Sequence, residues 1–458
     1  MSTKIVIIGG DAAGMSAASK VRRGMKEAEL VVFEKSPHIS YAACGMPYWF
    51  NGVVKQESDL LALTLENARN KRGIDVRIGH EVTAIDRAAK TVTVKKLESG
   101  ESWAESYDKL VIATGASAVR PPIPGLDLPN VFTLRSLEDG QRIKAHLESD
   151  RPKRGIIIGA GYIGLEVAEA FHDLGMQTTV IEMLPQIMPN MDAEIVAPIA
   201  EHVVEKGVDL RTSTKVTGLR AGDDGLIVET DSGEVATDMV LVSVGVKPNS
   251  ELTRDAGLAL GPRNAITVDA HLRTSDPDIY AAGDCVAYRH QILGEDVWIP
   301  LAPSANKGGR IVGENLVGEG TTFPGILGTA VVKVFDYSLA VTGLTERQAT
   351  EQQEKTGQFA GGVAASTITG GSKPHYYPGG APVTVKTVIE KATGRLLGAQ
   401  LASKSDVSKR ADIFAVALTA GMTVQQFGNL DLTYAPPFAP VYDPVIVAAN
   451  VAVKKVSG

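Results

Sequence analysis

The chain has 458 residues, enough for about three domains, and its 44% hydrophobic and 22% charged residues are the balance of a folded globular protein. A net charge of −7, without any stretch dominated by lysine and arginine, argues against a nucleic-acid partner, and no apolar run forms a signal peptide or reaches the roughly 20 residues of a membrane span. Two cysteines cannot build a disulfide framework or a structural zinc site, so we expect a cytoplasmic protein without a metal.

The N-terminal segment has the pattern of a β-α-β unit. An apolar strand at residues 4–8 runs into a glycine-rich turn at 9–14, a helix follows, and a second strand at 30–33 ends at Glu34. Only glycine tolerates such a turn and lets the backbone approach a pyrophosphate, while an acid at the end of the second strand can bind ribose hydroxyls. Asp11 stands where the middle glycine is expected, so the local phosphate geometry should differ.

The same pattern returns about 150 residues later. A strand at 155–158 runs into the turn 159–164, and after a helix a strand at 178–181 ends at Glu182. One glycine turn is weak evidence, but two copies with strand, helix and acid at the expected offsets predict two dinucleotide-binding units.

Further strands end in glycine turns and separate the units. Residues 107–115, 238–245 and 277–285 each have an apolar strand followed by such a turn. From about residue 328 the chain changes character, with alternating strands such as 383–389.

Together these segments resemble the FAD-dependent pyridine nucleotide–disulfide oxidoreductases over essentially the whole chain. The resemblance implies an α/β fold with two three-layer, Rossmann-like domains and a C-terminal α+β dimerisation domain, and therefore a homodimer. It places an FAD-binding domain at 1–118 and 250–325, an NAD(P)H-binding domain at 119–249, and the dimerisation domain at 328–458.

By this resemblance the first unit binds FAD and the second binds the nicotinamide cofactor. Asp284 is expected at the ribityl or pyrophosphate portion of FAD, and Glu34 at its adenosine ribose. Glu182 should favour NADH, because it can bind a free 2′-hydroxyl and residues 183–185 include no arginine for a 2′-phosphate, although NADPH use stays open. The expected cofactor-binding residues are Gly9, Gly10, Ala13, Gly14, Glu34, Lys35, Ala113, Thr114, Gly115, Gly159, Gly161, Tyr162, Ile163, Gly164, Glu182, Gly245, Gly283 and Asp284.

Cys44 decides the branch of the family. Disulfide reductases of the glutathione type carry two cysteines five positions apart, whereas here those positions are Ile39 and Trp49. A single thiol beneath a flavin can cycle as a sulfenic acid or as a mixed disulfide with a small thiol. A helix beginning at Cys44 should lower its pKa, whereas Cys285, just past a strand, fits a buried structural cysteine.

Ala12 separates the two single-cysteine chemistries. Family members that reduce oxygen or peroxide carry a histidine in the first glycine turn, so the chain is more similar to the coenzyme A–disulfide reductases. The resemblance implies that NAD(P)H reduces the flavin, which opens a Cys44–coenzyme A disulfide, and that Cys44 then attacks the next small-molecule disulfide. The alternatives are an oxygen-reducing NADH oxidase, a persulfide or polysulfide reductase, and a non-enzymatic NADH-sensing flavoprotein.

The resemblance also suggests where coenzyme A binds. Tyr376 and Tyr434 match two tyrosines that the partner subunit brings to the disulfide, where a phenol can protonate a departing thiolate; the rival interpretation is packing at the dimer seam. Phe438 lacks the hydroxyl of the commoner tyrosine. The cations on the first helix could equally complement its dipole. The expected substrate-binding residues are Ser16, Lys20, Arg23, Ser40, Arg72, Asn306 and Tyr442, of which Asn306 and Tyr442 stand where other members have basic residues.

Overall fold

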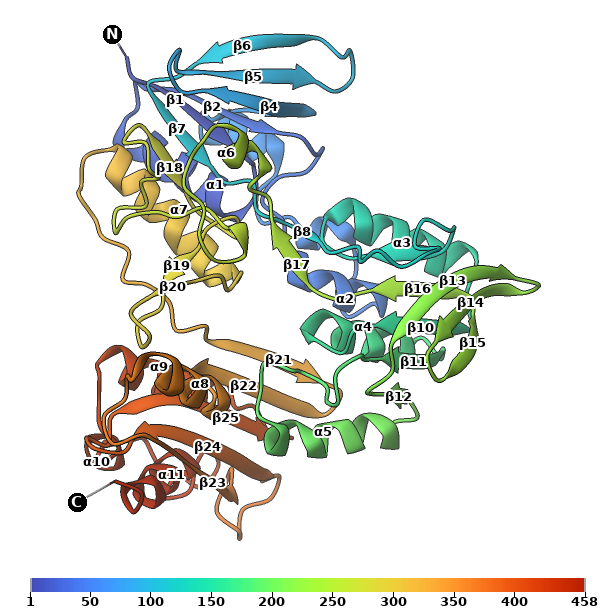
Figure 1. Ribbon diagram of the computed structural model, residues 1–458, viewed down its shortest axis with the longest axis vertical. Helices are drawn as coiled ribbons and strands as arrows, with labels where there is room; N and C mark the ends of the chain where they lie inside the picture. The colour runs from blue at the N-terminus through green and yellow to red at the C-terminus, as the bar shows by residue number, and fades with distance from the viewer. Residues whose placement is uncertain (1, 457–458) are drawn as a thin grey trace.

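The computed structural model describes residues 2–456, and its first unit is built on a five-stranded parallel sheet (Figure 1). In pairing order its strands are β18 (Ile279–Ala281), β7 (Lys109–Ile112), β1 (Lys4–Ile8), β2 (Glu29–Glu34) and β3 (Asp75–Ile78). Ile5, Val6 and Ile7 of the central strand are fully buried, as expected for a strand that is covered on both faces.

Two helices that are far apart in the chain pack on this sheet as a close pair. They are α1 (Ala12–Gly24) and α7 (Ala302–Leu316). A Cβ added at Gly309 would overlap the carbonyl oxygen of Ala13, so glycine allows the two backbones to touch. The return of residues 279–316 to the first sheet makes this unit discontinuous in sequence.

A small antiparallel sheet adds to the core of the first unit. Its strands are β4 (His80–Asp86), β5 (Thr91–Lys96) and β6 (Ser102–Ser106). The Trp103 ring packs edge-on against Phe33 of β2, with 6.5 Å between the ring centroids. Short elements complete the unit: α6 (Glu251–Asp255), β19 (Tyr288–Arg289), β20 (Asp296–Val297), and the turns η2 (Glu57–Leu60), η3 (Asn67–Lys71) and η4 (Pro262–Asn264).

The second unit repeats the parallel architecture. Its five strands pair in the order β12 (Asp209–Arg211), β11 (Gln177–Ile181), β10 (Arg154–Ile158), β16 (Met239–Val242) and β9 (Val131–Thr133). Helices α3 (Leu137–Ser149), α4 (Tyr162–Asp173) and α5 (Ala193–Glu205) accompany the sheet, together with the antiparallel strands β13 (Val216–Gly222), β14 (Gly225–Thr230) and β15 (Gly233–Thr237).

The chain crosses between these two units twice, and the crossings are paired. Strand β8 (Ala116–Ala118) runs antiparallel to β17 (Val246–Pro248). Asn249 ties them together, because its side-chain amide donates to the Thr114 carbonyl at 2.8 Å and its Oδ1 accepts from Ser117 Oγ at 2.6 Å. The second unit is thus inserted between two neighbouring strands.

The C-terminal unit is an antiparallel sheet with helices. Its strands pair in the order β21 (Ala330–Val334), β22 (Tyr337–Gly343), β25 (Leu396–Ser403), β24 (Pro382–Glu390) and β23 (Val363–Gly371). The helices are α8 (Glu346–Thr356), α9 (Ser408–Thr419), α10 (Val424–Gly428) and α11 (Pro444–Val453). Across residues 2–456, every helix is too short or too polar to cross a membrane.

Candidate active site

The two glycine turns have the same construction. Gly9 and Gly159 both have a positive φ, +105° and +107°, and a Cβ on either would overlap a backbone carbonyl oxygen of the neighbouring strand segment, that of Ala113 or Ser243. Each turn therefore requires glycine at its first position, and each leads directly into a helix N-terminus that can bind phosphate oxygens.

In each β-α-β unit, the acid at the end of the second strand stabilises the glycine turn by hydrogen bonds. Glu34 accepts hydrogen bonds from the backbone amides of Gly10 at 2.7 Å and Ser36 at 2.8 Å. Glu182 does the same with the amides of Ala160 and Leu184, both at 2.8 Å. A carboxylate has about four lone-pair sites, so both acids keep acceptor capacity for a ribose diol.

Asp11 links the first turn to the loop that carries the cysteine. Its Oδ1 accepts a hydrogen bond from the Tyr41 amide at 3.3 Å, and burial raises its pKa to about 6. Beside it, Ser40 has a positive φ of 45°, and its amide donates to the Gly10 carbonyl at 3.0 Å. The residue that departs from the glycine pattern thus helps to position the loop that leads to Cys44.

Cys44 lies in a 3₁₀ turn, η1 (Ala43–Gly45), directly before the short helix α2 (Met46–Phe50), and its side chain is exposed. The apolar side chains of α2 join the core of the second unit around Leu137 of α3. A Cβ at Gly45 would meet the end of the Leu60 side chain, which would have to shift. The cysteine therefore lies directly before α2, the helix through which the first unit contacts α3 and α4 of the second unit (Figure 1).

The expected lowering of the Cys44 pKa is wrong for this chain. Partial desolvation and, next, the negative charge of Glu166 raise the pKa of the thiol, and the opposing effect of Arg135 is smaller. Glu166 lies on α4, and its Oε1 accepts a hydrogen bond from the Tyr48 hydroxyl of α2 at 3.3 Å.

Arg135 is a site residue that sequence reasoning missed. Its guanidinium lies 2.9 Å from a carboxylate oxygen of Asp284. Burial raises the pKa of Asp284, and Arg135 opposes that shift. The available signal was the sequence that follows: Ser136 and Asp139 form a capping box that starts α3, which holds Arg135 immediately before the helix.

The expected substrate residues form two groups in the chain. Ser16 and Asn306 meet across α1 and α7, with 3.1 Å between Oγ and Oδ1. Lys20 forms an ion pair with Glu319 at 2.7 Å, and Arg72 donates to Ser19 Oγ at 2.9 Å. Arg23 is exposed and has no side-chain hydrogen bond or ion pair among residues 2–456.

The second group lies on the C-terminal unit. The hydroxyls of Tyr376 and Tyr434 are 3.4 Å apart, although 58 residues separate them in the sequence. Tyr442 and Phe438 are exposed on the same unit, at 69% and 79%. These exposed aromatic side chains form a surface that a partner could cover.

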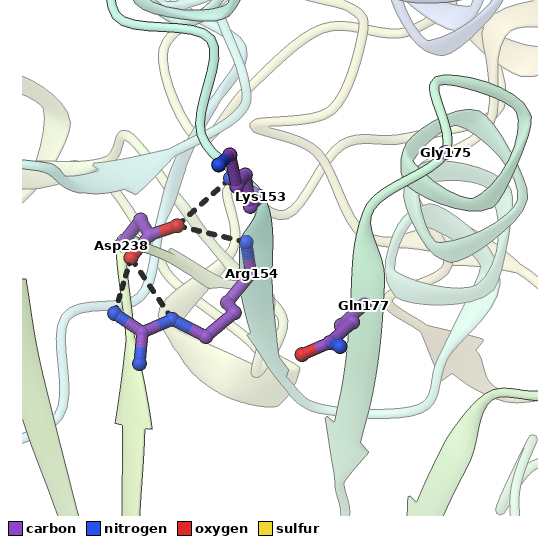
Figure 2. A pocket seen from close by; sticks show the side chains of 5 residues that line it. All are labelled: Lys153, Arg154, Gly175, Gln177 and Asp238. Atoms are coloured by element: carbon purple, nitrogen blue, oxygen red, sulfur yellow. Dashed lines mark hydrogen bonds and ion pairs between the residues drawn. The ribbon is translucent and has the colours of Figure 1, made fainter.

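Two other features lie outside this site. A hollow of about 410 Å³, lined by Arg154, Asp238 and Gln177, lies where strands β10, β11 and β16 begin, at the sheet edge opposite the glycine turn (Figure 2). The carboxylates of Asp192, Glu194 and Glu346 lie close enough together to hold a cation, but the Lys386 ammonium already contacts all three.

Comparison with known proteins identifies the family. Residues 3–309 match the model described as pyridine nucleotide-disulphide oxidoreductase, and residues 329–444 match the dimerisation domain of the same family. The chain belongs to the pyridine nucleotide-disulphide oxidoreductases, and it is an enzyme of that class. This confirms the fold class expected from the sequence.

Relatives resemble the chain over almost its whole length. A Pyrococcus furiosus protein named NAD(P)H sulfur oxidoreductase (CoA-dependent) is 40% identical and covers 98% of each chain. A coenzyme A disulfide reductase of Staphylococcus haemolyticus is 30% identical, covering 95% of this chain and 96% of that one. The solved NAD-dependent persulfide reductase from A. fulgidus has a TM-score of 0.94 at 40% identity, covering 99% of this chain and 83% of that one.

FAD and a nicotinamide dinucleotide, the cofactors expected from the sequence, are those of this family. The two turns fit them. A Cβ added at Gly161 would meet no atom within 4 Å, so the second turn has open space above its backbone amides. At the first turn Asp11 adds a negative charge, and Arg135 is the cation close enough to lower its pKa. The two turns therefore have the backbone geometry that two dinucleotides require.

Proposed function

We propose that this enzyme reduces coenzyme A disulfide, or a persulfide carried on coenzyme A, with electrons from NADH and through Cys44 alone. The observation that carries the proposal is the position of Cys44, the exposed thiol at the junction of the two units. The second cysteine, Cys285, is fully buried, and its Sγ lies 3.5 Å from the Ala282 carbonyl oxygen. One exposed and one buried cysteine support a catalytic cycle in which only Cys44 exchanges disulfides.

The chemistry at Cys44 is thiol–disulfide exchange. Its thiolate attacks one sulfur of the incoming disulfide, so that a Cys44–S–S–coenzyme A bond forms while one coenzyme A thiolate leaves. When bound, FAD and NADH supply the two electrons needed to break this bond and release the second thiolate. The protein positions the disulfide and stabilises the departing thiolates.

Coenzyme A would lie along α1 and α7. Ser16, Asn306 and the exposed guanidinium of Arg23 offer polar and charged groups there, and Arg72 and Ser40 extend this set. Lys20 can bind a phosphate of coenzyme A only after its ion pair with Glu319 is broken.

We infer a homodimer in which Tyr376 and Tyr434 of one subunit reach the disulfide at the other subunit. The matched dimerisation domain, the two hydroxyls 3.4 Å apart and the exposed Tyr442 support this. We also propose a cytoplasmic location and the domain boundaries given above. The proposed preference for NADH over NADPH rests on Glu182.

Intact-mass analysis tests the proposal. The purified holoenzyme is treated with coenzyme A disulfide and then with NADH, and we expect the gain and then the loss of one coenzyme A per chain on the Cys44 peptide. Absence of any adduct, with persistent NADH consumption, would overturn it. Oxygen reduction is the rival outcome: rapid turnover with oxygen and none with coenzyme A disulfide would favour an NADH oxidase, which Ala12 in the first turn disfavours.

A further inference from the structure

The carboxylate of Glu166 is placed next to the reactive loop by two helices of different units. Glu166 lies one turn into α4, the helix that starts from the second glycine turn. Its hydrogen-bond partner Tyr48 lies on α2, four residues after Cys44. The Tyr48 hydroxyl and the Glu166 carboxyl group thus join the segment that carries Cys44 to helix α4.

Glu166 is a lone negative charge at this place. Within residues 2–456 no lysine, arginine or histidine side chain pairs with it. The neighbouring acid on α4, Glu169, has partners of its own in the C-terminal unit, since it forms an ion pair with Lys333 and accepts a hydrogen bond from the Phe335 amide. Ionising a half-buried carboxyl group that has no cation beside it costs free energy, so burial favours its protonated form.

Burial is the main reason why Glu166 favours its protonated form. Burial raises the pKa of Glu166 to about 7, the Tyr48 hydrogen bond opposes that shift, and the charge of Glu169 adds to it. Glu166 is also the strongest charged influence on Cys44, ahead of Arg135 and Asp284. Both groups also influence Tyr48, since the charges of Glu166 and Cys44 each raise the pKa of its hydroxyl.

We propose that Glu166, acting through Tyr48, is the positioning residue that controls ionisation of the Cys44 thiol and stores the proton which disulfide reduction consumes. The inference rests on the proposed function. A neutral Glu166 shifts Cys44 towards the thiolate that attacks a disulfide, and an ionised Glu166 favours the protonated thiol.

The proton balance requires such a group. Reduction of one disulfide to two thiols with NADH takes up one proton, because NADH delivers two electrons and only one hydrogen nucleus. A carboxylic acid with a pKa near 7 is a stronger acid than a thiol, whose ordinary pKa is about 8.5. Glu166 can therefore give up its proton when a thiolate forms, which leaves a thiol and a Glu166 carboxylate that accepts the hydrogen bond of the Tyr48 hydroxyl. The carboxylate regains a proton from water.

The test measures the thiol itself rather than turnover. The FAD-containing enzyme is reduced with dithiothreitol, desalted, and alkylated with iodoacetamide between pH 5 and pH 10, with the Cys44 peptide followed by mass spectrometry. For Glu166→Gln we expect the inflection of the Cys44 rate to move to lower pH and the rate at pH 7 to rise about threefold, since one negative charge is lost. The wild type should show a second inflection near pH 7, which the variant lacks.

Asp173→Asn is the matched control. Asp173 also lies on α4 and also bonds the α2 segment, since the Asn51 side-chain amide donates to it at 2.9 Å. We expect its alkylation profile to match the wild type, and Glu166→Asp to restore the second inflection. Flavin absorbance verifies folding of each variant.

The two proposals fail in different ways. If the Cys44 profile of Glu166→Gln superimposes on that of the wild type while the coenzyme A adduct still forms, the role of Glu166 is overturned and the proposed function stands. If Cys44 forms no adduct with coenzyme A disulfide in the wild type, the proposed function itself fails.

Discussion

The ammonium group of Lys386 lies 2.9 Å from a carboxylate oxygen of Asp192, across the boundary between the second unit and the C-terminal unit. Only 3% of the Lys386 side chain and 7% of the Asp192 side chain are exposed. Gln400 completes the contact by donating to the same carboxylate at 2.6 Å. This buried pair is one of the contacts that hold the second unit against the C-terminal unit.

Replacement of Lys386 by Met should therefore destabilise the enzyme by about 3 kcal/mol, because Asp192 is left buried without its cation. The hydrogen bonds from Lys386 and Gln400 hold the pKa of Asp192 below its ordinary value despite burial, so the stabilising effect is present at neutral pH and is lost as the pH falls below about 4. Thermal unfolding at pH 7 and pH 3.5 measures both effects. Lys409→Met, at an 86% exposed side chain, is the control and should change little.

Asp11→Asn should stabilise the FAD-free protein. Burial raises the pKa of Asp11 to about 6, so the folded state disfavours its ionised form, and this cost is present above pH 6 and absent below about pH 4. The amide oxygen can still accept the bond from the Tyr41 amide. We expect a gain of about 2 kcal/mol at pH 8 that vanishes at pH 4, measured by urea unfolding. An equal gain at both pH values would contradict the assignment.

Arg135→Gln should weaken FAD retention. The substitution leaves the Asp284 carboxylate without its ion pair at 2.9 Å and removes the cation that offsets Asp11. The ratio of flavin absorbance to protein absorbance after gel filtration reports the loss. Arg142→Gln removes an exposed cation bonded to Asp139 on the same helix and should retain FAD like the wild type.

Met183→Arg should increase the use of NADPH. Met183 is 63% exposed beside Glu182, where a guanidinium could meet a 2′-phosphate. One charge-assisted hydrogen bond corresponds to about a tenfold rise in kcat/KM for NADPH. Met183→Gln has a similar side-chain length without the charge, and its ratio of NADH to NADPH kcat/KM should stay near that of the wild type.

Tyr434→Phe should lower kcat for coenzyme A disulfide by about tenfold if its phenol donates a proton to a departing thiolate. The subunit mass in solution should stay that of the wild type, because the hydroxyl rather than the ring is removed. Tyr377→Phe removes a hydroxyl from the residue next to Tyr376 and serves as the control. A normal kcat in Tyr434→Phe would leave this tyrosine with a packing role.

The sequence was sufficient for the features that depend on local pattern. The two turns at Gly9 and Gly159 and their acids follow from strand, turn and helix spacing, and the structure shows the same construction at both. Contacts between distant segments leave no local pattern in the sequence. Arg135 and Asp284 are 149 residues apart, and nothing in the chain between them marks their pairing.

The pKa of Cys44 shows the same limit. From sequence, a helix start after Cys44 predicts a lower pKa, because a helix N-terminus favours negative charge. The structure shows that partial desolvation of the thiol and, next, the charge of Glu166, 122 positions along the chain on another unit, act in the opposite direction. Electrostatic effects of this kind depend on tertiary neighbours, which local spacing does not reveal.

The antiparallel pairing of β8 with β17 has an evolutionary consequence. Because the inserted segment leaves and rejoins the first unit at adjacent strands, it can be exchanged between homologous enzymes as a cassette with two neighbouring splice points. The exchange has constraints beyond those splice points, because the inserted unit also pairs with the C-terminal unit through Asp192 and Lys386. The donor cassette must offer a surface that receives Met46 and Trp49, or the reactive sulfur will lose its alignment while both halves still fold.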